Sequence, residues 1–368
     1  MNALPEVISH AFGQTDQTRP RPLKRGPLPL DPLRDPGWDA LVAAHRDATL
    51  FHSAAWARVL KDTYRHSPVY FGRRQNDRLE SLLPVMEVNS PWTGRRGVSL
   101  PFTDECPLLA ENSAAVAQLH EQALAHGRER RWKYFETRGG PRPPGTDTPS
   151  VLYYAHELDL TPGEKHLFEH CESATRRGIR RAQNAGVRID RRTDLGAMRS
   201  FYRLHCGTRR RHGVPPQPFR FFENIARHVL VTGHGSVFTA SHCGRVVAAA
   251  VFFHLGRQAI YKFGASDFSA QEQRPNNLLM WEAIRFCAER GCETLQFGRT
   301  SLANEGLRRF KLGFGTRERQ LPAYRFEFRR NRFVATVDRA EGPLNRVFRQ
   351  FPSPILRLLG ATLYPHLS

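Results

Sequence analysis

The sequence contains little lysine, few cysteines and no long apolar run. Only six of its 55 basic residues are lysine, and 35 acidic residues leave a formal net charge of +20 at pH 7. No apolar stretch reaches the roughly 18 residues that a membrane-spanning helix requires, and residues 1–30 contain no apolar run suited to a signal peptide. We therefore expect a cytoplasmic protein with no transmembrane helix.

Several missing motifs exclude other classes of protein. The six cysteines form no CxxC pair, and no cysteine or histidine cluster has the spacing of a zinc site. We expect reduced thiols and no bound metal. The sequence also lacks the GxSxG nucleophile turn, the HExxH zinc motif and the GxxxxGK[ST] phosphate loop. An α/β-hydrolase, a zinc peptidase and a P-loop NTPase are therefore excluded.

Arginine is what the sequence has in excess. Arginine-rich composition often reflects GC-rich coding, but this does not explain why bases outnumber acids by 20. A positive field of this size attracts nucleic acids, anionic lipid headgroups and phosphorylated substrates. A polyanionic partner, with tRNA among the candidates, is one interpretation of this charge, and a solvated basic surface is the other.

Length and pattern predict an α/β protein with two similar units. A chain of 368 residues is long for one core, and a Gly/Pro-rich stretch at residues 138–150 marks a natural boundary. In each unit the patterns predict helices, an antiparallel meander, and then one more helix and strand. The predicted divisions are a flexible Pro-rich lead-in (1–36), a first domain (37–150), a second domain (151–330) and a basic amphipathic tail (331–368).

Three pairs of landmarks repeat at nearly constant spacing. In both units a strand is followed by an aspartate, the next helix is expected to end at a glycine, and the next strand ends at an arginine. The pairs lie 161–164 residues apart and are Asp104 with Asp267, Gly127 with Gly291, and Arg138 with Arg299. This spacing indicates a tandem duplication.

The order of elements resembles the GNAT acyltransferase fold, and its duplication resembles the FemAB-related double-GNAT N-acyltransferases. This family includes a group associated with exosortase and exopolysaccharide systems. The similarity is most specific in the second unit, where "RRGIRRAQNAGV", "FYRLHCGTRRRHGVP", "RPNNLLMWEAI", "ERGCETLQFGRTS" and "FKLGFG" occur in the family's order. The resemblance implies a tandem GNAT-like fold, with mixed, mostly antiparallel sheets and flanking helices.

The resemblance also implies a function. Fem-type enzymes pass an aminoacyl group from a tRNA ester to an amine of a peptidoglycan precursor. We therefore expect N-acyl transfer onto an amine of a cell-envelope glycan or peptidoglycan-type precursor, with a small-molecule or lipid-linked acceptor and no permanently bound cofactor. Two alternatives stay open: an acetyl-CoA-dependent N-acetyltransferase in exopolysaccharide biosynthesis, and a non-catalytic GNAT-like protein that binds polyanions.

Lys311 and Asp104 are the expected catalytic residues. The resemblance implies that Lys311, in "FKLGFG", lies beside the reacting carbonyl and that Asp104 is the base. Acyl transfer places negative charge on the carbonyl oxygen, which a lysine cation can approach as a compact point charge. The alternatives are a surface lysine whose stem packs between Phe310 and Phe314, an Asp104 that only forms a turn, and Asp267 as the base.

Substrate-binding residues are expected around these two side chains. Arg177 and Arg181 share a helix row and either hold phosphates or form a solvated face. Asn276 and Asn277 are expected to begin a helix, where side chains cap and backbone N–H groups can receive an anion. The full expected set is Phe310, Gly313, Phe314, Arg299, Thr300, Asn276, Asn277, Tyr261, Lys262, Asp267, Arg177 and Arg181.

The acyl donor and the role of the tail are left open by the sequence. The glycine-rich Q/R-x-x-G-x-G/A loop of acetyl-CoA-binding GNAT enzymes is missing from "GASDFSAQEQRPNN", so the donor is either aminoacyl-tRNA or an acyl-CoA bound in another way. The tail "NRVFRQFPSPILRLLGATLYPHLS" mixes apolar residues with arginines. It either lies on the inner face of the membrane, which suits a lipid-linked acceptor, or covers an apolar patch of the enzyme body.

Overall fold

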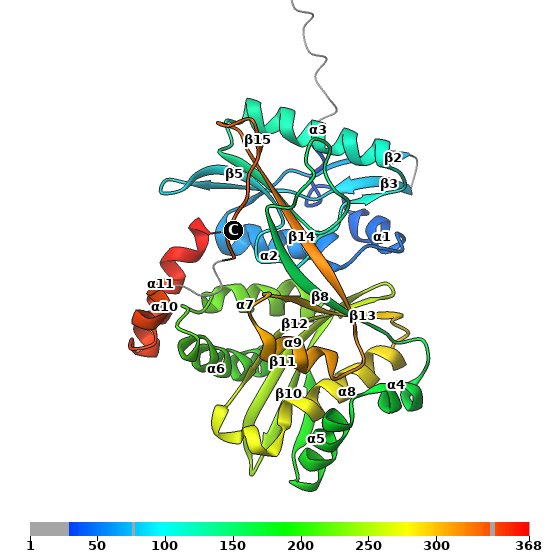
Figure 1. The fold of residues 1–368 in the computed structure, drawn as a ribbon, viewed down its shortest axis with the longest axis vertical. Helices are drawn as coiled ribbons and strands as arrows, with labels where there is room; N and C mark the ends of the chain where they lie inside the picture. Colours follow the sequence, from blue (N-terminus) through cyan, green and yellow to red (C-terminus); the bar gives the residue numbers. More distant parts are fainter. Residues whose placement is uncertain (1–28, 76–77, 339–342, 368) are drawn as a thin grey trace, which may run out of the picture.

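A long mixed sheet organises the molecule (Figure 1). The structure is a computed structural model that describes residues 29–75, 78–338 and 343–367. Its strands are β1 (Ser67–Pro68), β2 (Phe71–Gln75), β3 (Arg78–Leu83), β4 (Met86–Ser90), β5 (Gly94–Ser99), β6 (Leu109–Ala110), β7 (Tyr134–Arg138), β8 (Val151–Asp159), β9 (Arg188–Arg192), β10 (Gly235–His242), β11 (Arg245–Leu255), β12 (Gln258–Ser266), β13 (Thr294–Thr300), β14 (Arg317–Glu327) and β15 (Arg332–Phe333).

Helices flank this sheet on both faces. The α-helices are α1 (Trp38–Ala43), α2 (Ala54–Tyr64), α3 (Ser113–Glu129), α4 (Glu164–His170), α5 (Ser173–Asn184), α6 (Leu195–Arg211), α7 (Phe219–Ile225), α8 (Pro275–Glu289), α9 (Glu305–Leu312), α10 (Pro343–Phe348) and α11 (Ser353–Leu363). Four short helical turns accompany them: η1 (Leu50–His52), η2 (Ala226–Leu230), η3 (Phe268–Gln273) and η4 (Tyr364–His366). The expected mixed α/β class is confirmed.

Strand β14 joins the two halves of the sheet. The 12-stranded sheet has the order β1-β4-β5-β7-β14-β8-β13-β12-β11-β10-β9, with β15 paired to β14, and a smaller sheet has the order β2-β3-β6. Residues 323–327 of β14 pair antiparallel with β7, and residues 317–323 pair antiparallel with β8. In Figure 1, β14 (orange) runs between the part that carries β5 and α3 and the part that carries β11 and α8. A strand from near the end of the chain, β14, therefore pairs with β7 of the first half.

Each half contains one parallel strand pair connected by a helix. Residues 97–99 of β5 pair with 135–137 of β7 across α3, and residues 258–260 of β12 pair with 294–296 of β13 across α8. Beyond residues 260 and 296 no further β12–β13 pairing is present among the described residues. The same arrangement at the expected spacing agrees with a tandem duplication.

The two faces of the sheet carry two apolar cores. Along β11 the side chains alternate: Val251 and Phe253 pack in the cluster that contains α2, α6 and α7, whereas Ala250 and Phe252 pack in the cluster that contains α5 and α8. Both phenylalanines are buried. A third cluster, around Trp132, holds α3 against the first half.

Turn and helix-end predictions have mixed outcomes. The predicted turn at Cys243-Gly244 joins β10 to β11, and both residues have the positive φ values, 49° and 71°, that such hairpin turns require. Gly291, with φ 83°, follows α8 as predicted. The predicted stop at Gly127 is wrong, because α3 continues to Glu129. Gly127 instead allows close packing, since a Cβ there would lie 2.3 Å from the ring of Phe328.

The ends of the described chain pack on the body. Most of the predicted flexible lead-in lies outside the described residues; in its last part, Leu30 exchanges two backbone hydrogen bonds with Tyr70. The inner face of the tail covers the body: Leu356 is buried, and the Tyr364 hydroxyl donates to the carbonyl oxygen of Pro215 at 3.1 Å. The interpretation that the tail covers a patch of the body is therefore confirmed for this face.

Candidate active site

Lys311 is held inside the protein by two backbone carbonyls. It lies in the last turn of α9 and is 2% exposed. Its Nζ donates to the carbonyl oxygens of Gly298, at 2.9 Å, and Arg299, at 3.2 Å. Burial lowers the pKa of Lys311 to about 8, against the opposing effect of Asp104. The alternative of a surface lysine is therefore wrong, and these two bonds use two of the three N–H donors of the ammonium.

Asp104 and Lys262 form an ion pair that joins the two halves. Asp104 lies in the loop after β5, and its Oδ2 accepts from Nζ of Lys262, on β12, at 2.8 Å. Burial raises the pKa of Asp104, but Lys262, Arg299 and Lys311 outweigh this effect and hold the pKa below its usual range. Burial lowers the pKa of Lys262, and Asp104 only partly opposes this. Three cations thus surround one carboxylate, so the site favours an additional anionic atom.

His156 faces the same site from β8. Its Nε2 lies 3.0 Å from Oε2 of Glu318, and Arg308 donates to both oxygens of that carboxylate, at 2.6 and 2.8 Å. Burial lowers the pKa of His156, and Lys311 lowers it further, although Glu318 opposes both. A neutral imidazole that donates from Nε2 to Glu318 has an acceptor lone pair on Nδ1. Nδ1 is buried and has no hydrogen-bond partner among the described residues.

A small cavity is lined by two of these residues, Asp104 and His156, but not by Lys311 or Lys262. Its volume is about 10 Å³, and its walls include Asp104, His156, Gly298 and the ion pair between Glu105 and Arg319. Arg319 donates to Glu105 at 2.5 Å, and burial raises the pKa of that carboxyl. A cavity of this size holds roughly one water molecule. Substrates can therefore reach it only when the surrounding side chains move apart.

Glycines make this arrangement possible at two positions. Gly298 has φ +68°, and a Cβ there would lie 3.1 Å from Oδ2 of Asp104. Gly313 has ordinary helical φ, but a Cβ there would lie 2.4 Å from Oγ1 of Thr175 on α5. The "FKLGFG" motif therefore combines an inward lysine with a helix end that lies close to α5.

Arg299, Thr300 and Tyr261 lie around the lysines. The Arg299 guanidinium lies over the ring of Tyr153, 4.7 Å from its centroid. Thr300 is buried, and its Oγ1 has no hydrogen-bond partner among the described residues. Tyr261 packs against Phe252, with ring centroids 5.2 Å apart, and burial raises its pKa to about 12. Its position indicates packing rather than substrate contact.

Phe310 and Phe314 belong to the apolar core. Their ring centroids are 5.3 Å apart, and Phe314 also lies 6.1 Å from the ring of Phe297. Phe314 is 1% exposed, so no surface remains for a substrate. A substrate-binding role for Phe314 stays a prediction, and in this arrangement its ring contacts Phe297 and Phe310.

Asp267 has hydrogen-bond partners within its own turn. Asp267 caps η3 by accepting from the backbone N and the Oγ of Ser269, at 3.0 and 2.7 Å, and these bonds lower its pKa. None of its described hydrogen bonds or ion pairs involves Lys311 or Lys262. A turn-forming role was the alternative for Asp104. Asp267 is the aspartate that has this role.

Asn276 and Asn277 are not helix caps. Helix α8 begins at Pro275, and its N-cap is Arg274, with φ 53° and no side-chain cap. Asn276 Nδ2 donates instead to Oγ of Ser266 at 3.2 Å, and Asn277 lies against α5, 3.0 Å from where a Cβ of Gly178 would be. The expected cap is absent because proline already occupies the first position of the helix.

Arg177 and Arg181 are exposed on α5. Neither takes part in an ion pair within the described part of the chain. Because α5 packs on α8 at Gly178 and Asn277, both arginines belong to the surface near the start of α8. They are separate from the buried site around Lys311.

Sequence reasoning missed His156, Glu318, Glu105 and Arg319. His156 lies in "YYAHELD", an alternating strand whose inward positions are otherwise apolar or small. A buried histidine on the inward face of a strand is a signal that could have found it. Its partner Glu318 lies 162 residues away on β14, and no local pattern predicts that pairing.

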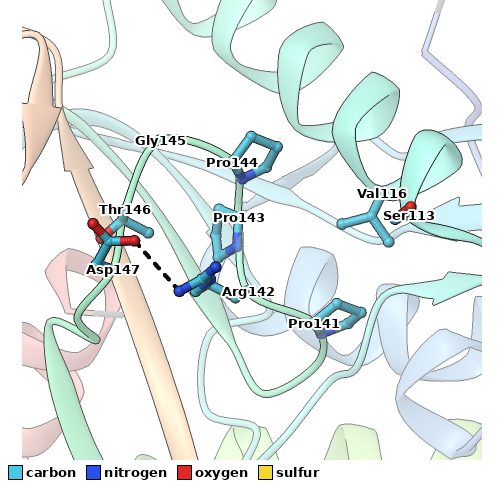
Figure 2. A pocket seen from close by; sticks show the side chains of 9 residues that line it. All are labelled: Ser113, Val116, Pro141, Arg142, Pro143, Pro144, Gly145, Thr146 and Asp147. Carbon is cyan, nitrogen blue, oxygen red and sulfur yellow. Dashed lines mark hydrogen bonds and ion pairs between the residues drawn. The ribbon is translucent and has the colours of Figure 1, made fainter.

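A larger pocket lies elsewhere. Figure 2 shows a pocket of about 450 Å³ between the start of α3, at Ser113 and Val116, and the loop of residues 141–147. Prolines form much of its wall, and its charged pair, Arg142 with Asp147 at 3.4 Å, is exposed. Buried ionised groups like those around Lys311 are absent from its lining. Size alone therefore does not identify the reactive centre.

Neither a metal site nor a membrane span is found in the described ranges. No group of three or more His, Cys, Asp or Glu residues there could hold a metal ion. Within the same residues, none of the helices combines the length and the apolar character needed to cross a bilayer.

Comparisons with known proteins agree with the fold. Residues 170–312, which include both Lys262 and Lys311, match the family model of the acetyltransferase (GNAT) domain. No curated protein matches the chain. The crystal structure of FemX aligns with a TM-score of 0.63 and 14% identity, covering 85% of this chain and 98% of FemX. The expected resemblance to FemAB-like double-GNAT proteins is confirmed, and the family match supports the expected acyltransferase.

Two other solved structures are similar. The C-terminal domain (DUF2156) of a candidate lysylphosphatidylglycerol synthetase from Agrobacterium fabrum aligns with a TM-score of 0.50 and 14% identity, covering 73% of this chain and 86% of that domain. A tandem GNAT protein from the clavulanic acid biosynthesis pathway aligns with a TM-score of 0.48 and 11% identity, covering 82% of this chain and 97% of its own. At these identities the likeness concerns the fold.

Proposed function

We propose, from the premise of an acyltransferase with a FemAB-like tandem GNAT fold, that this chain transfers an acyl or aminoacyl group to an amine. The observation that carries the proposal is Lys311, a buried ammonium fixed by the carbonyls of Gly298 and Arg299 within the matched GNAT region. Burying a lysine cation costs free energy, and packing alone does not explain why this lysine is buried. A developing oxyanion is the partner that such a charge would stabilise.

The reaction assigns a role to each buried group. The amine nitrogen attacks the carbonyl carbon of the donor, and the carbonyl π electrons move onto the oxygen beside the Lys311 ammonium. A proton then leaves the nitrogen. When the tetrahedral intermediate collapses, the carbonyl re-forms, and the bond to sulfur in a thioester or to oxygen in an aminoacyl ester breaks. The leaving group takes up a proton.

His156 is the better placed acceptor of that proton. A general base needs a free lone pair near the reacting amine; Nδ1 of His156 is buried without a partner in the described residues, and His156 lines the small cavity. Asp104 is already paired with Lys262, and its lowered pKa makes it a weak base. We assign Asp104 to holding Lys262 and balancing Lys311, and His156 to proton transfer.

The exposed arginines near α8 are proposed to hold the donor. Arg177, Arg181 and Arg274 are exposed, and their charges suit the phosphates of CoA or of a tRNA acceptor end. Pro275 removes one backbone N–H from the start of α8, which weakens pyrophosphate binding of the usual GNAT kind. This favours aminoacyl-tRNA, and acetyl-CoA is the second candidate.

The acceptor is proposed to be an amine of a cell-envelope glycan or peptidoglycan-type precursor, reached at the cytoplasmic face of the membrane. The support is the fold shared with FemX together with the motifs around Lys311. The non-catalytic alternative, a polyanion-binding protein, is less well supported, because Lys311 and Asp104 share a buried site instead of a convex basic surface.

A donor and acceptor screen tests the proposal. Purified protein is incubated with aminoacyl-tRNA or acyl-CoA and with amino-sugar or peptidoglycan-precursor amines, and products are detected by mass spectrometry. A new amide should form with wild type and be nearly absent with Lys311→Met. Equal yields from wild type and Lys311→Met would contradict the proposed site, and polyanion binding without any product would favour the non-catalytic alternative.

A further inference from the structure

The tail gathers exposed apolar side chains on one side of the molecule. Ten large hydrophobic side chains are exposed in the described chain, and five of them lie between positions 344 and 367. These five, here called the tail face, are Leu344 (63% exposed), Val347 (48%), Ile355 (47%), Leu358 (69%) and Leu367 (45%). Single exposed apolar residues need no explanation, but such a concentration marks an interaction surface.

The tail face is fixed in place by contacts on its other side. On α11, Gly360 lies so close to the body that a Cβ would be 1.9 Å from the carbonyl oxygen of Pro216. A Cβ at Gly213 would likewise collide with the backbone carbonyl oxygen of Asn345 on α10. The carbonyl oxygen of His366 accepts from Arg96 at 2.8 Å. In Figure 1, α10 and α11 (red) accordingly lie together along one edge of the body.

A tryptophan extends this surface. Trp92, in the turn between β4 and β5, is 65% exposed, and its ring lies 4.0 Å from that of His366. The other four tryptophans of the chain are buried: Trp38, Trp56, Trp132 and Trp281. Tryptophan favours the boundary between water and lipid because its ring is apolar and its N–H is polar. Trp92 is therefore both a candidate contact and a natural reporter.

Positive charge surrounds the tail face. Residues 343–367 include no aspartate or glutamate, and Arg346, Arg349 and Arg357 are exposed among them. Helix α6 packs along α11, and Arg357 lies over the ring of Tyr202 on α6 at 5.6 Å. Three further exposed arginines of α6 lie roughly 60–100° around its axis from Tyr202: Arg199, Arg203 and Arg210.

We propose that the tail face, with Trp92 and the arginines around it, docks on the surface of an anionic lipid bilayer. Apolar side chains enter the boundary between headgroups and acyl chains, and cations beside them attract anionic lipids. Such a surface therefore binds anionic membranes through both the hydrophobic effect and electrostatic attraction. The charge argues against a second copy as the occupant, because two copies with net charge +20 would bring their arginines together. The docking surface does not depend on the chemistry at Lys311.

Vesicle flotation with the full chain tests the docking. Vesicles of phosphatidylcholine with phosphatidylglycerol should carry wild type upward at low salt, and vesicles of phosphatidylcholine alone should carry much less. Leu344→Glu/Leu358→Glu should lose binding, and Arg199→Gln/Arg203→Gln should weaken it by roughly fivefold for each arginine. Val231→Glu, which changes a 76% exposed side chain outside the tail, is the matched control.

Trp92 fluorescence decides where the protein contacts the lipid. Anionic vesicles with brominated acyl chains should quench wild-type fluorescence, and Trp92→Phe should abolish the quenching while flotation continues. Light scattering on the same samples reports the oligomeric state. The proposal is overturned if wild type does not float, if Leu344→Glu/Leu358→Glu floats like wild type, or if those substitutions convert a dimer to a monomer and leave lipid binding unchanged.

Discussion

The two halves of the molecule use the same parallel strand pair differently. In the first half, beyond the paired residues of β5 and β7, buried Arg138 donates to the carbonyl oxygen of Leu100 at 3.3 Å and to Glu136 at 2.9 Å. Glu136 also accepts from Arg325 of β14, so each charge has a partner. In the second half, Lys262 and Lys311 lie beyond the paired residues of β12 and β13, and Asp104 is the one carboxylate that forms an ion pair with either of them within the described residues.

The comparison separates support from chemistry. Burial raises the pKa of Glu136, but its arginines outweigh this effect and keep it ionised and paired. Two arginines share that carboxylate, and each donates to it directly. Near Lys311, burial lowers the pKa of both lysines, and the hydrogen bonds of Lys311 in the described residues go to two backbone carbonyls. A network in which each cation donates to a carboxylate stabilises a fold, whereas a buried cation held by carbonyl oxygens is positioned to bind negative charge that arrives with a substrate. We infer that the parallel strand pair of the first half supports the sheet and that of the second half carries the reaction, with Asp104 supplied by the first half.

The largest expected effect concerns the ion-pair network around Glu136. Glu136→Gln keeps the side-chain size but leaves buried Arg138 without its carboxylate, so the free energy of unfolding should fall by about 3–5 kcal/mol, while kcat of the folded protein changes little. Asp104→Asn, the matched change at the ion pair with Lys262, should lower both stability and kcat. Denaturant unfolding and steady-state kinetics measure the two quantities. A loss of kcat in Glu136→Gln comparable to that in Asp104→Asn would remove the distinction.

His156→Gln should lower kcat by about 100-fold with little change in stability, because a proton acceptor is lost but size and polarity are kept. Its lowered pKa implies that wild-type His156 is a neutral base above its ordinary pKa of about 6.5, so kcat should not decline between pH 6.5 and 7.5. Glu318→Gln, which removes the group that orients His156, should cause a smaller loss. Wild-type kcat in His156→Gln would assign the base elsewhere.

The pKa of Lys311 also predicts how stability depends on pH. The pKa is lowered from 10.5 to about 8 in the folded protein, so between these values the unfolded chain binds more protons and stability rises with pH. Relative to Lys311→Met, wild type should gain about 2–4 kcal/mol in unfolding free energy from pH 8 to 10.5. Lys61→Met, which replaces an exposed lysine and keeps Lys311, should show the same pH dependence as wild type. A parallel pH dependence in wild type and Lys311→Met would contradict the lowered pKa.

The smallest expected effect concerns the donor surface. Arg177→Gln/Arg181→Gln should reduce the slope of log affinity against log salt for tRNA by about 0.7–0.9 for each phosphate that is no longer neutralised. Arg220→Gln/Arg227→Gln changes two exposed arginines on α7 and η2 and serves as the control. Filter binding over a range of salt concentrations measures both slopes, and equal slopes for wild type and Arg177→Gln/Arg181→Gln would exclude these arginines.

The sequence predicts part of this arrangement well. The rarity of lysine and the "FKLGFG" motif single out Lys311, and the repeated landmarks predict the two similar halves. The crossing of β14 could not be predicted, because alternation along a strand defines its faces but not its neighbours. His156 was missed for the same reason, since Glu318 and Arg308 reach it only through that crossing. A motif position also does not reveal how deeply a ring is buried, as Phe314 with 1% exposure illustrates.

The rate of a single turnover as a function of pH tests the central claim most directly. Wild type and Lys311→Met are compared with a donor and acceptor that give product, using circular dichroism to confirm equal folding. If the Lys311 cation stabilises the oxyanion, Lys311→Met should be about 100–1,000-fold slower. The wild-type rate should then fall as pH rises through about 8, where Lys311 loses its proton. A Lys311→Met rate equal to wild type, or a wild-type rate that rises through that pH and depends on Lys311, would contradict the account.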